Sequence, residues 1–286
     1  MRAAWFLVVL VLGCARTFPL CRDEACVQAE LVDAGIPPAP RDGGFAAQVA
    51  YLKSQNTEAG DAFGEALALS GDGTTLAVGA PGEDSRSQGN PFDNRASASG
   101  AVSVFVRREG VWTAQAFLKA ATPRQGDHFG HRVSLSRDGN TLAVSAVDES
   151  SDSVGIDQPQ VNARAPSSGA VFIFTRTGSA WAQTAYLKAS NTGANDLFGE
   201  SVSLSADGAV LVVGAPGEAS DAVGPGGNPF NDRAPGRGAV YVFRREPEWI
   251  QTSYLKSRAA DVTGFGCQGS GIRSRSGLRL VPVHAA

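Results

Sequence analysis

The feature that most constrains the fold of this chain is a Phe-Gly pair that returns at regular intervals. The pairs begin at Phe63, Phe129, Phe198 and Phe265. The intervals between them are 66, 69 and 67 residues. A second marker, an aromatic residue followed by Leu-Lys, keeps the same step, and its lysines are Lys53, Lys119, Lys188 and Lys256. Two independent markers with one period predict a protein built from repeated structural units.

Each unit contains four short stretches with the character of β-strands. The first alternates in polarity, as in residues 198–205, and leads into an Asp-Gly pair that is typical of a tight hairpin turn. The second and third stretches are apolar on both faces, which indicates strands buried inside a sheet. The fourth mixes aromatic and polar residues, as an exposed edge strand does. The pattern therefore predicts an all-β protein made of four-stranded antiparallel sheets packed face to face, the blades of a β-propeller.

The repeated motifs resemble FG-GAP repeats. The likeness rests on Phe-Gly at the start of each unit and on Val-Gly-Ala-Pro at residues 78–81 and 213–216; the middle unit departs from it with Val-Ser-Ala-Val at 144–147. The longer pattern is similar to the bacterial FG-GAP class of exported and surface proteins, and to the propeller of integrin α subunits. The resemblance implies propeller blades over residues 45–266, in units near 63–121, 129–190 and 198–258. Three units and fragments amount to an incomplete ring.

The first residues predict export. A short apolar run over residues 3–12 suits the core of a signal peptide and is too short to span a bilayer. It ends in Val-Leu-Gly-Cys, which resembles a bacterial lipobox. This resemblance implies a signal peptide over residues 1–13, a lipid on Cys14 and an anchor and linker over 14–44. The alternative is an ordinary secretory signal that contains Cys14.

Two further segments carry expectations of their own. Cys21 and Cys26 are close enough in sequence to form a local disulfide, and a metal site there would need more ligands than the segment offers. Residues 267–286 contain neither Asp nor Glu and break the repeat inside its own motif. We interpret this aberrant tail as the product of a frameshift or truncation, with a short natural tail as the alternative.

The long loops between the second and third strands of a unit are the candidate binding surface. Two of them contain nearly the same motif, Asn-Pro-Phe followed by Asp and Asn in either order and then Arg. The candidate residues are Asn90, Asp93, Asn94, Arg95, Asn228, Asn231, Asp232 and Arg233. The alternative is structural: Asn and Asp satisfy the loop backbone, and the Phe tucks into its own blade. A cation site could also be assembled there from Glu83, Asp84, Asp93, Glu218 and Asp232.

Other candidate sites favour structural interpretations. The Asp-Gly pairs at residues 72–73, 138–139 and 207–208 each offer one carboxylate, which is too few for calcium, so we interpret them as turns and assign no metal or cofactor. His128 and His131 lack the Glu and the spacing of a zinc protease motif and are interpreted as variation between units. The carboxylates two residues before each Phe-Gly pair suggest hydrogen bonds within loops or turns. They are Asp61, Asp127 and Asp196.

The sequence thus favours a non-enzymatic binding or adhesion module, anchored by lipid on a bacterial cell surface, with a protein or glycan partner. The chain is slightly acidic, with 28 Asp and Glu against 25 Lys and Arg. The basic residues form no stripe along the sequence, so no nucleic-acid partner is expected. Neither a nucleophile elbow nor a phosphate-binding loop is present, and no catalytic residue is assigned. The alternatives are an accessory propeller of a truncated exported enzyme and a decayed gene product.

Overall fold

A computed structural model describes most of the repeat region. The described residues are 50–87, 90–160, 162–224, 227–258 and 263–267. Within them the chain forms twelve β-strands and no helix. The chain divides into two compact units, residues 1–52 and 53–286, and every one of these strands lies in the second. The all-β prediction is confirmed.

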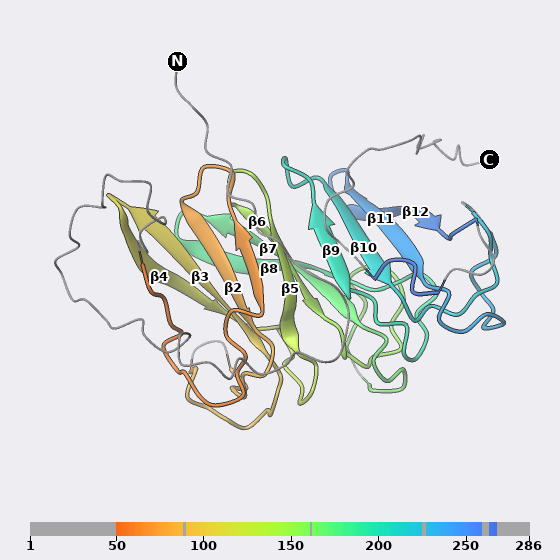
Figure 1. Cartoon of the computed structure of the whole chain (residues 1–286), viewed down its shortest axis with the longest axis horizontal. Helices are drawn as coiled ribbons and strands as arrows, with labels where there is room; N and C mark the ends of the chain where they lie inside the picture. The colour runs from red at the N-terminus through yellow and green to blue at the C-terminus, as the bar shows by residue number, and fades with distance from the viewer. Residues whose placement is uncertain (1–49, 88–89, 161, 225–226, 259–262, 268–286) are drawn as a thin grey trace, which may run out of the picture. The chain divides into compact units, whose positions relative to one another are not determined.

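The strands form three sheets, each made of four consecutive antiparallel strands (Figure 1). The first sheet contains β1 (Ala66–Leu69), β2 (Thr75–Ala80), β3 (Ala101–Arg108) and β4 (Val111–Leu118). The second contains β5 (Phe129–Leu135), β6 (Thr141–Ala146), β7 (Ala170–Thr177) and β8 (Ala180–Leu187). The third contains β9 (Ser201–Leu204), β10 (Val210–Ala215), β11 (Ala239–Arg245) and β12 (Trp249–Leu255). One sheet per repeat is the arrangement of propeller blades, and in the described residues the three blades do not close into a ring.

Burial follows the predicted order of strands. β2, β6 and β10 lie inside their sheets and are almost wholly buried, as their continuous apolar sequences require. β4 and β12 are edge strands, and most of their residues are exposed or only partly buried. Neighbouring blades share their cores: Val104 of the first blade and Leu142 of the second belong to one buried apolar cluster. Burial of these shared side chains is what holds the blades together.

The alternation predicted for the first strand of each unit is only partly correct. Residues 198–205 were expected to form one regular strand, but β9 begins at Ser201, and Gly64 and Gly199 have a positive φ of 100°. In β5, where the strand does include Phe129, the register with β6 shifts before Val133. The Phe-Gly pair is therefore a turn or bulge, which only glycine adopts without strain, and Phe does not continue the alternating face.

The Phe-Gly pair joins each blade to the one before it. Phe129 forms a parallel bridge with Gly100, and Phe265 repeats this bridge with Gly238. A Cβ atom on Gly79 would lie 2.1 Å from the carbonyl oxygen of Gly130, so no side chain fits there. The Phe-Gly turn of the next blade therefore crowds this glycine.

The first blade has an exposed apolar strand. Leu67 and Leu69 of β1 are 62% and 50% exposed. The equivalent residues of the second blade, Val133 and Leu135, are partly buried against the core that the first and second blades share. The difference arises because no described part of the chain covers β1 as the first blade covers β5.

Several sequence predictions lie outside the described residues. They are the signal peptide 1–13, the lipidated Cys14 with its linker, the Cys21–Cys26 pair, and residues 268–286 of the predicted tail. Among the residues that are described, the structure contains no helix long and apolar enough to cross a membrane.

Candidate functional site

The antiparallel order gives every blade two different ends. The connections β2–β3, β6–β7 and β10–β11 are long and leave the sheets at one end, together with the segments that lead to the next blade (Figure 1). We call this end the loop rim. The Asp-Gly turns and the short hairpins between the third and fourth strands lie at the opposite end, which we call the turn rim.

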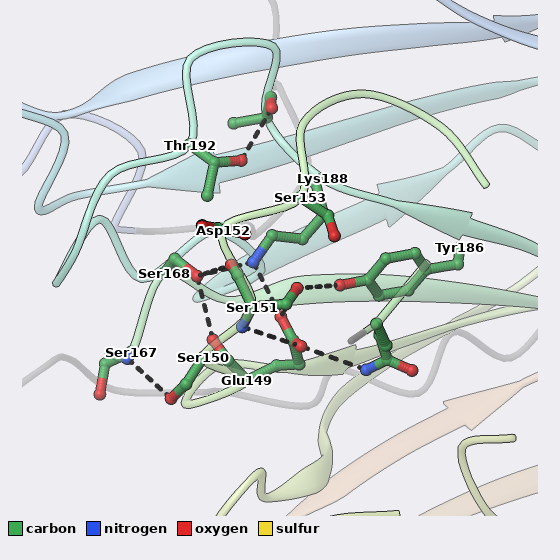
Figure 2. A network of polar contacts seen from close by, with 12 residues as sticks. Glu149, Ser150, Ser151, Asp152, Ser153, Ser167, Ser168, Tyr186, Lys188 and Thr192 are labelled. Carbon is green, nitrogen blue, oxygen red and sulfur yellow. Dashed lines mark hydrogen bonds and ion pairs between the residues drawn. The ribbon is translucent and has the colours of Figure 1, made fainter. Parts of the chain in front are cut away.

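A buried ion pair forms the base of each long loop. In the second blade, Lys188 donates to Glu149 Oε2 at 2.8 Å and to Ser168 Oγ at 2.6 Å (Figure 2). Glu149 also accepts hydrogen bonds from Ser151, whose hydroxyl lies 2.7 Å from that of Tyr186. Both charged side chains have no exposed surface. The network ties the start and end of the loop to the last residues of β8.

The same pair occurs in the other two blades. Lys119 lies 2.8 Å from both Glu83 Oε2 and Ser99 Oγ, and Lys256 pairs with Glu218. The Glu follows the second strand in every unit, and the Lys belongs to the aromatic-Leu-Lys marker. Neither residue was recognised from the sequence as half of an ion pair. The signal that could have revealed the pair is that every unit contains one such Glu and one such Lys, separated by 36, 39 and 38 residues in the three units.

Electrostatics favour the charged form of Glu149 in the second blade. Burial opposes the charge of Glu149, but the ammonium of Lys188 and hydrogen bonds from Lys188, Gln160 and Ser151 outweigh it and lower the pKa of Glu149. Burial also lowers the pKa of Lys188, and Glu149 opposes that shift. The hypothesis of a cation site that uses Glu83 and Glu218 is therefore wrong, because a lysine already occupies the position that a cation would take.

A second buried carboxylate stands beside each ion pair. These are the aspartates that precede the Phe-Gly pairs, Asp61, Asp127 and Asp196, and each is at most 6% exposed. Asp61 and Asp196 accept a backbone N–H from three residues before them, both at 2.8 Å, as the sequence suggested. Burial raises the pKa of Asp127 to about 7, with a further contribution from the charge of Glu149. Asp127 Oδ2 is buried and has no hydrogen-bond partner among the described residues.

The tips of the first and third loops are exposed and share one local geometry. The Oδ1 atom of Asn90 accepts the backbone N–H of Phe92 at 3.1 Å, and Asn228 does the same for Phe230 at 2.9 Å. These are Asx turns, in which the side chain fixes the backbone two residues ahead. The two loops thus hold their phenylalanines in the same way.

Both phenylalanines project into solvent. Phe92 is 67% exposed and Phe230 is 75% exposed. The expectation that Phe tucks into its own blade is wrong, since both side chains are mostly exposed. Phe92 and Phe230 are functional candidates that sequence reasoning missed. Their signal was an apolar residue placed twice in an otherwise polar loop.

The other candidate residues surround these phenylalanines. Arg95 pairs with Asp93, and Asn94 donates to Glu58 at 2.7 Å. In the third loop Asn231 Oδ1 accepts the N–H groups of Asp221 and Arg233. Asp232 is exposed and adds charge beside the tip. The structure places all eight predicted residues on the loop rim, four in each of two loops, and Asn90, Asn228 and Asn231 have the backbone role that the structural alternative gives them.

The middle loop follows the same plan without the motif. Asn162 Oδ1 accepts the backbone N–H groups of Asp152 and Arg164, and the Arg164 side chain lies 3.9 Å from that of Asp152. This matches the Asn231–Asp221–Arg233 arrangement of the third loop. The middle loop exposes Val154, as the third loop exposes Val223, both about half exposed. The rim therefore presents apolar and basic side chains from all three blades.

The remaining candidates have structural surroundings. Asp72, Asp138 and Asp207 each accept a hydrogen bond from the serine two residues before them, which closes the Asp-Gly turn. His128 Nδ1 lies 2.7 Å from Asp148, and this hydrogen bond raises the pKa of His128. Within the described part of the chain, no group of three or more His, Cys, Asp or Glu side chains is placed to hold a metal ion.

Comparison with known proteins identifies the repeat. A family model for the FG-GAP repeat matches residues 47–105 and 181–243. Both segments are thus similar to FG-GAP repeats. The first match contains Phe63-Gly64 and Val78–Pro81, and the second contains Phe198-Gly199 and Val213–Pro216. No curated protein matches the chain.

Solved structures similar to the FG-GAP units are distant. A candidate 6-phosphogluconolactonase of Bacteroides uniformis has a TM-score of 0.37 and 14% identity, over 70% of this chain and 44% of its own. Sqt1 of Saccharomyces cerevisiae has a TM-score of 0.36 and 9% identity, over 69% and 36%. A hypothetical selenium-binding protein of Sulfolobus tokodaii has a TM-score of 0.33 and 11% identity, over 67% and 42%. The chain spans less than half the length of each.

Proposed function

We propose that this chain is a non-enzymatic binding module that engages a protein or glycan partner through its loop rim, on the surface of a bacterial envelope. The observation that carries the proposal is the pair of exposed phenylalanines, Phe92 and Phe230, held by identical Asx turns. Exposing a large aromatic side chain to water is unfavourable. Its repetition on a rigid scaffold is explained by contact with a partner, and aromatic residues are the usual anchors of such contacts.

Charged side chains near the two phenylalanines support a binding role for the loop rim. Arg95 and Arg233 follow the two phenylalanines by three residues, and their side chains are 73% and 78% exposed. An aromatic ring with an arginine beside it provides an apolar face and a directional hydrogen-bond donor. Protein interfaces are enriched in both residue types, and a sugar ring offers C–H groups to the aromatic face and hydroxyl groups to the arginine.

The buried pairs of serine and lysine favour a structural role over catalysis. Ser99 and Lys119, and Ser168 and Lys188, have the residue types of a serine–lysine catalytic pair. Each lysine is ion-paired with a glutamate and has no exposed side-chain surface. A charged lysine does not accept a proton from serine, and substrate does not reach a buried hydroxyl.

The proposed location of the protein on the bacterial envelope rests only on the signal-like sequence of residues 1–14. Replacing Cys14 by Ser should abolish incorporation of labelled palmitate into the expressed chain. Incorporation that survives this replacement would remove the anchor from the proposal while leaving the loop rim untouched.

The binding role is tested with the full chain on arrays of purified glycans and of purified cell-surface proteins. The wild-type chain should bind a limited set of spots, and the F92A/F230A variant should lose them. I250A is the matched control, because Ile250 is 46% exposed but lies on β12, outside the loops. Binding that is equal in F92A/F230A and wild type would overturn the proposal.

A further inference from the structure

The turn rim contains a hollow at the junction of the first and second blades. Its volume is about 500 Å³, and it lies between the β3–β4 hairpin of the first blade and the β6–β7 strands of the second. Three of its lining residues are arginines, Arg107, Arg108 and Arg176, and none is acidic. This places three permanent positive charges around one open space.

Arg176 is held in place by neutral groups. Its Nε donates to Asn140 Oδ1 at 3.0 Å, and its Nη1 lies 3.2 Å from Thr75 Oγ1 and 3.3 Å from Gln115 Oε1. The guanidinium carbon lies 5.4 Å from the centre of the Trp181 ring. These contacts fix the orientation of the guanidinium plane but leave its charge without a counterion. The Nη2 group has no acceptor among the described residues.

Other arginines of the chain, unlike these three, form ion pairs with carboxylates. Arg95, Arg132, Arg164, Arg233 and Arg244 each form an ion pair with a carboxylate. No ion pair involves the three arginines of the hollow in the part of the chain that the structure describes. Asp72 and Asp138, which are near in sequence, accept hydrogen bonds within their own turns. Three like charges around one space repel each other unless an anion joins them.

The junction of the second and third blades lacks this arrangement. Arg245 stands in the third blade where Arg176 stands in the second, since each donates its backbone N–H to the residue after an Asp-Gly pair. The acceptor Asn140 is replaced there by Ala209, and the second blade contributes Thr177 to that junction in the place where the first blade contributes Arg108 to this one. The basic hollow is thus a feature of one junction and is not imposed by the repeat.

We propose that this hollow binds a sulfate or phosphate ester group carried by a sugar-sized ligand. The N–H groups of a guanidinium donate charge-assisted hydrogen bonds to the oxygens of a tetrahedral oxyanion. The fixed Arg176 has its Nη2 free for such a bond, and Arg107 and Arg108 add charge at the edge of the hollow. The volume exceeds that of the anion alone and leaves room for the group that bears it. This site is separate from the loop rim.

The test is a calorimetric titration of the full chain with glucose 6-sulfate and glucose 6-phosphate at constant ionic strength, with glucose as the blank. Saturable binding of either ester is expected. R108Q should weaken it at least about fivefold through loss of one charge-assisted contact. R176K should weaken it as well, because lysine lacks the planar fork. Preference for one ester identifies whether the source is a sulfated or a phosphorylated sugar.

R245Q is the matched control, since it removes the equivalent arginine at the other junction. It should leave affinity unchanged. Arg108 lies at the exposed end of β3, so R108Q tests the site even where a change at Arg176 disturbs the fold. The proposal is overturned by the absence of saturable binding for both esters, by equal affinity in R108Q and wild type, or by equal weakening in R245Q and R108Q.

Discussion

The base of the long loop recurs in all three blades and its Asn-Pro-Phe tip in two of them, yet the physical situations of base and tip are opposite. At the base, Glu149 and Lys188 are fully buried and hydrogen-bonded to each other, and Lys188 also donates to Ser168. At the tip, Phe92 and Phe230 are mostly exposed and touch solvent. Repetition of the base is explained by packing, because a buried charge requires its partner. Packing does not explain the repetition of the tip, and we therefore propose the tip as the functional surface.

The largest effect is expected where the base is broken. K188A leaves Glu149 buried without its partner and should lower the free energy of unfolding by about 3–5 kcal/mol, measured by urea denaturation. The double variant E149L/K188M removes both charges and should recover much of this loss. A K188A loss below about 1 kcal/mol would show that the pair behaves as a surface ion pair and that the base is not the structural element we describe.

A pH-dependent effect of intermediate size is expected beside the base. The pKa of Asp127 is raised to about 7 and that of Asp196 to about 6. A carboxyl group whose pKa is raised by folding destabilises the folded state as it ionises, so stability should fall as pH rises from about 4 to about 7. D127N should reduce this fall, by an amount measurable in urea midpoints across the pH range. A wild-type stability that rises steadily over this range, unchanged by D127N, would contradict the assignment.

The sequence predicts the strands of the blades well, but it predicts the base and the tip of the long loops poorly. The strand order and the edge strands were predictable, because they depend on the local pattern of polar and apolar residues. The buried Glu83–Lys119 pair was not predictable, because a hydrophobicity pattern assigns charged residues to the protein surface. The turn at Phe198-Gly199 was mistaken for strand, since its alternation looks regular until glycine adopts a positive φ. The exposure of Phe92 was missed because loop phenylalanines are expected to pack.

A smaller effect is expected where the tip is anchored. N228A removes the acceptor for the backbone N–H of Phe230 and should cost about 0.5–1.5 kcal/mol, the usual contribution of one hydrogen bond. Its effect on partner binding should be larger in proportion, because the ring is no longer held. Array binding and urea denaturation on the same preparations separate the two effects. Loss of stability comparable to that of K188A would erase the distinction between base and tip.

The smallest effect on stability is expected at the tip itself. F92A and F230A should each change the free energy of unfolding by no more than about 0.5 kcal/mol, the usual range for exposed positions. Thermal or urea unfolding of the full chain gives this value directly. A cost of about 2 kcal/mol or more, typical of a buried side chain, would assign the phenylalanines to the core.

Hydroxyl-radical labelling of the full chain, with the rate read at each phenylalanine by mass spectrometry, tests the contrast between base and tip most directly. The account predicts fast labelling of Phe92 and Phe230 and slow labelling of the buried Phe129, Phe172, Phe174, Phe198 and Phe243. Rates at Phe92 and Phe230 as slow as at Phe129 would contradict the account, because the loop rim would then have no exposed aromatic surface to offer a partner.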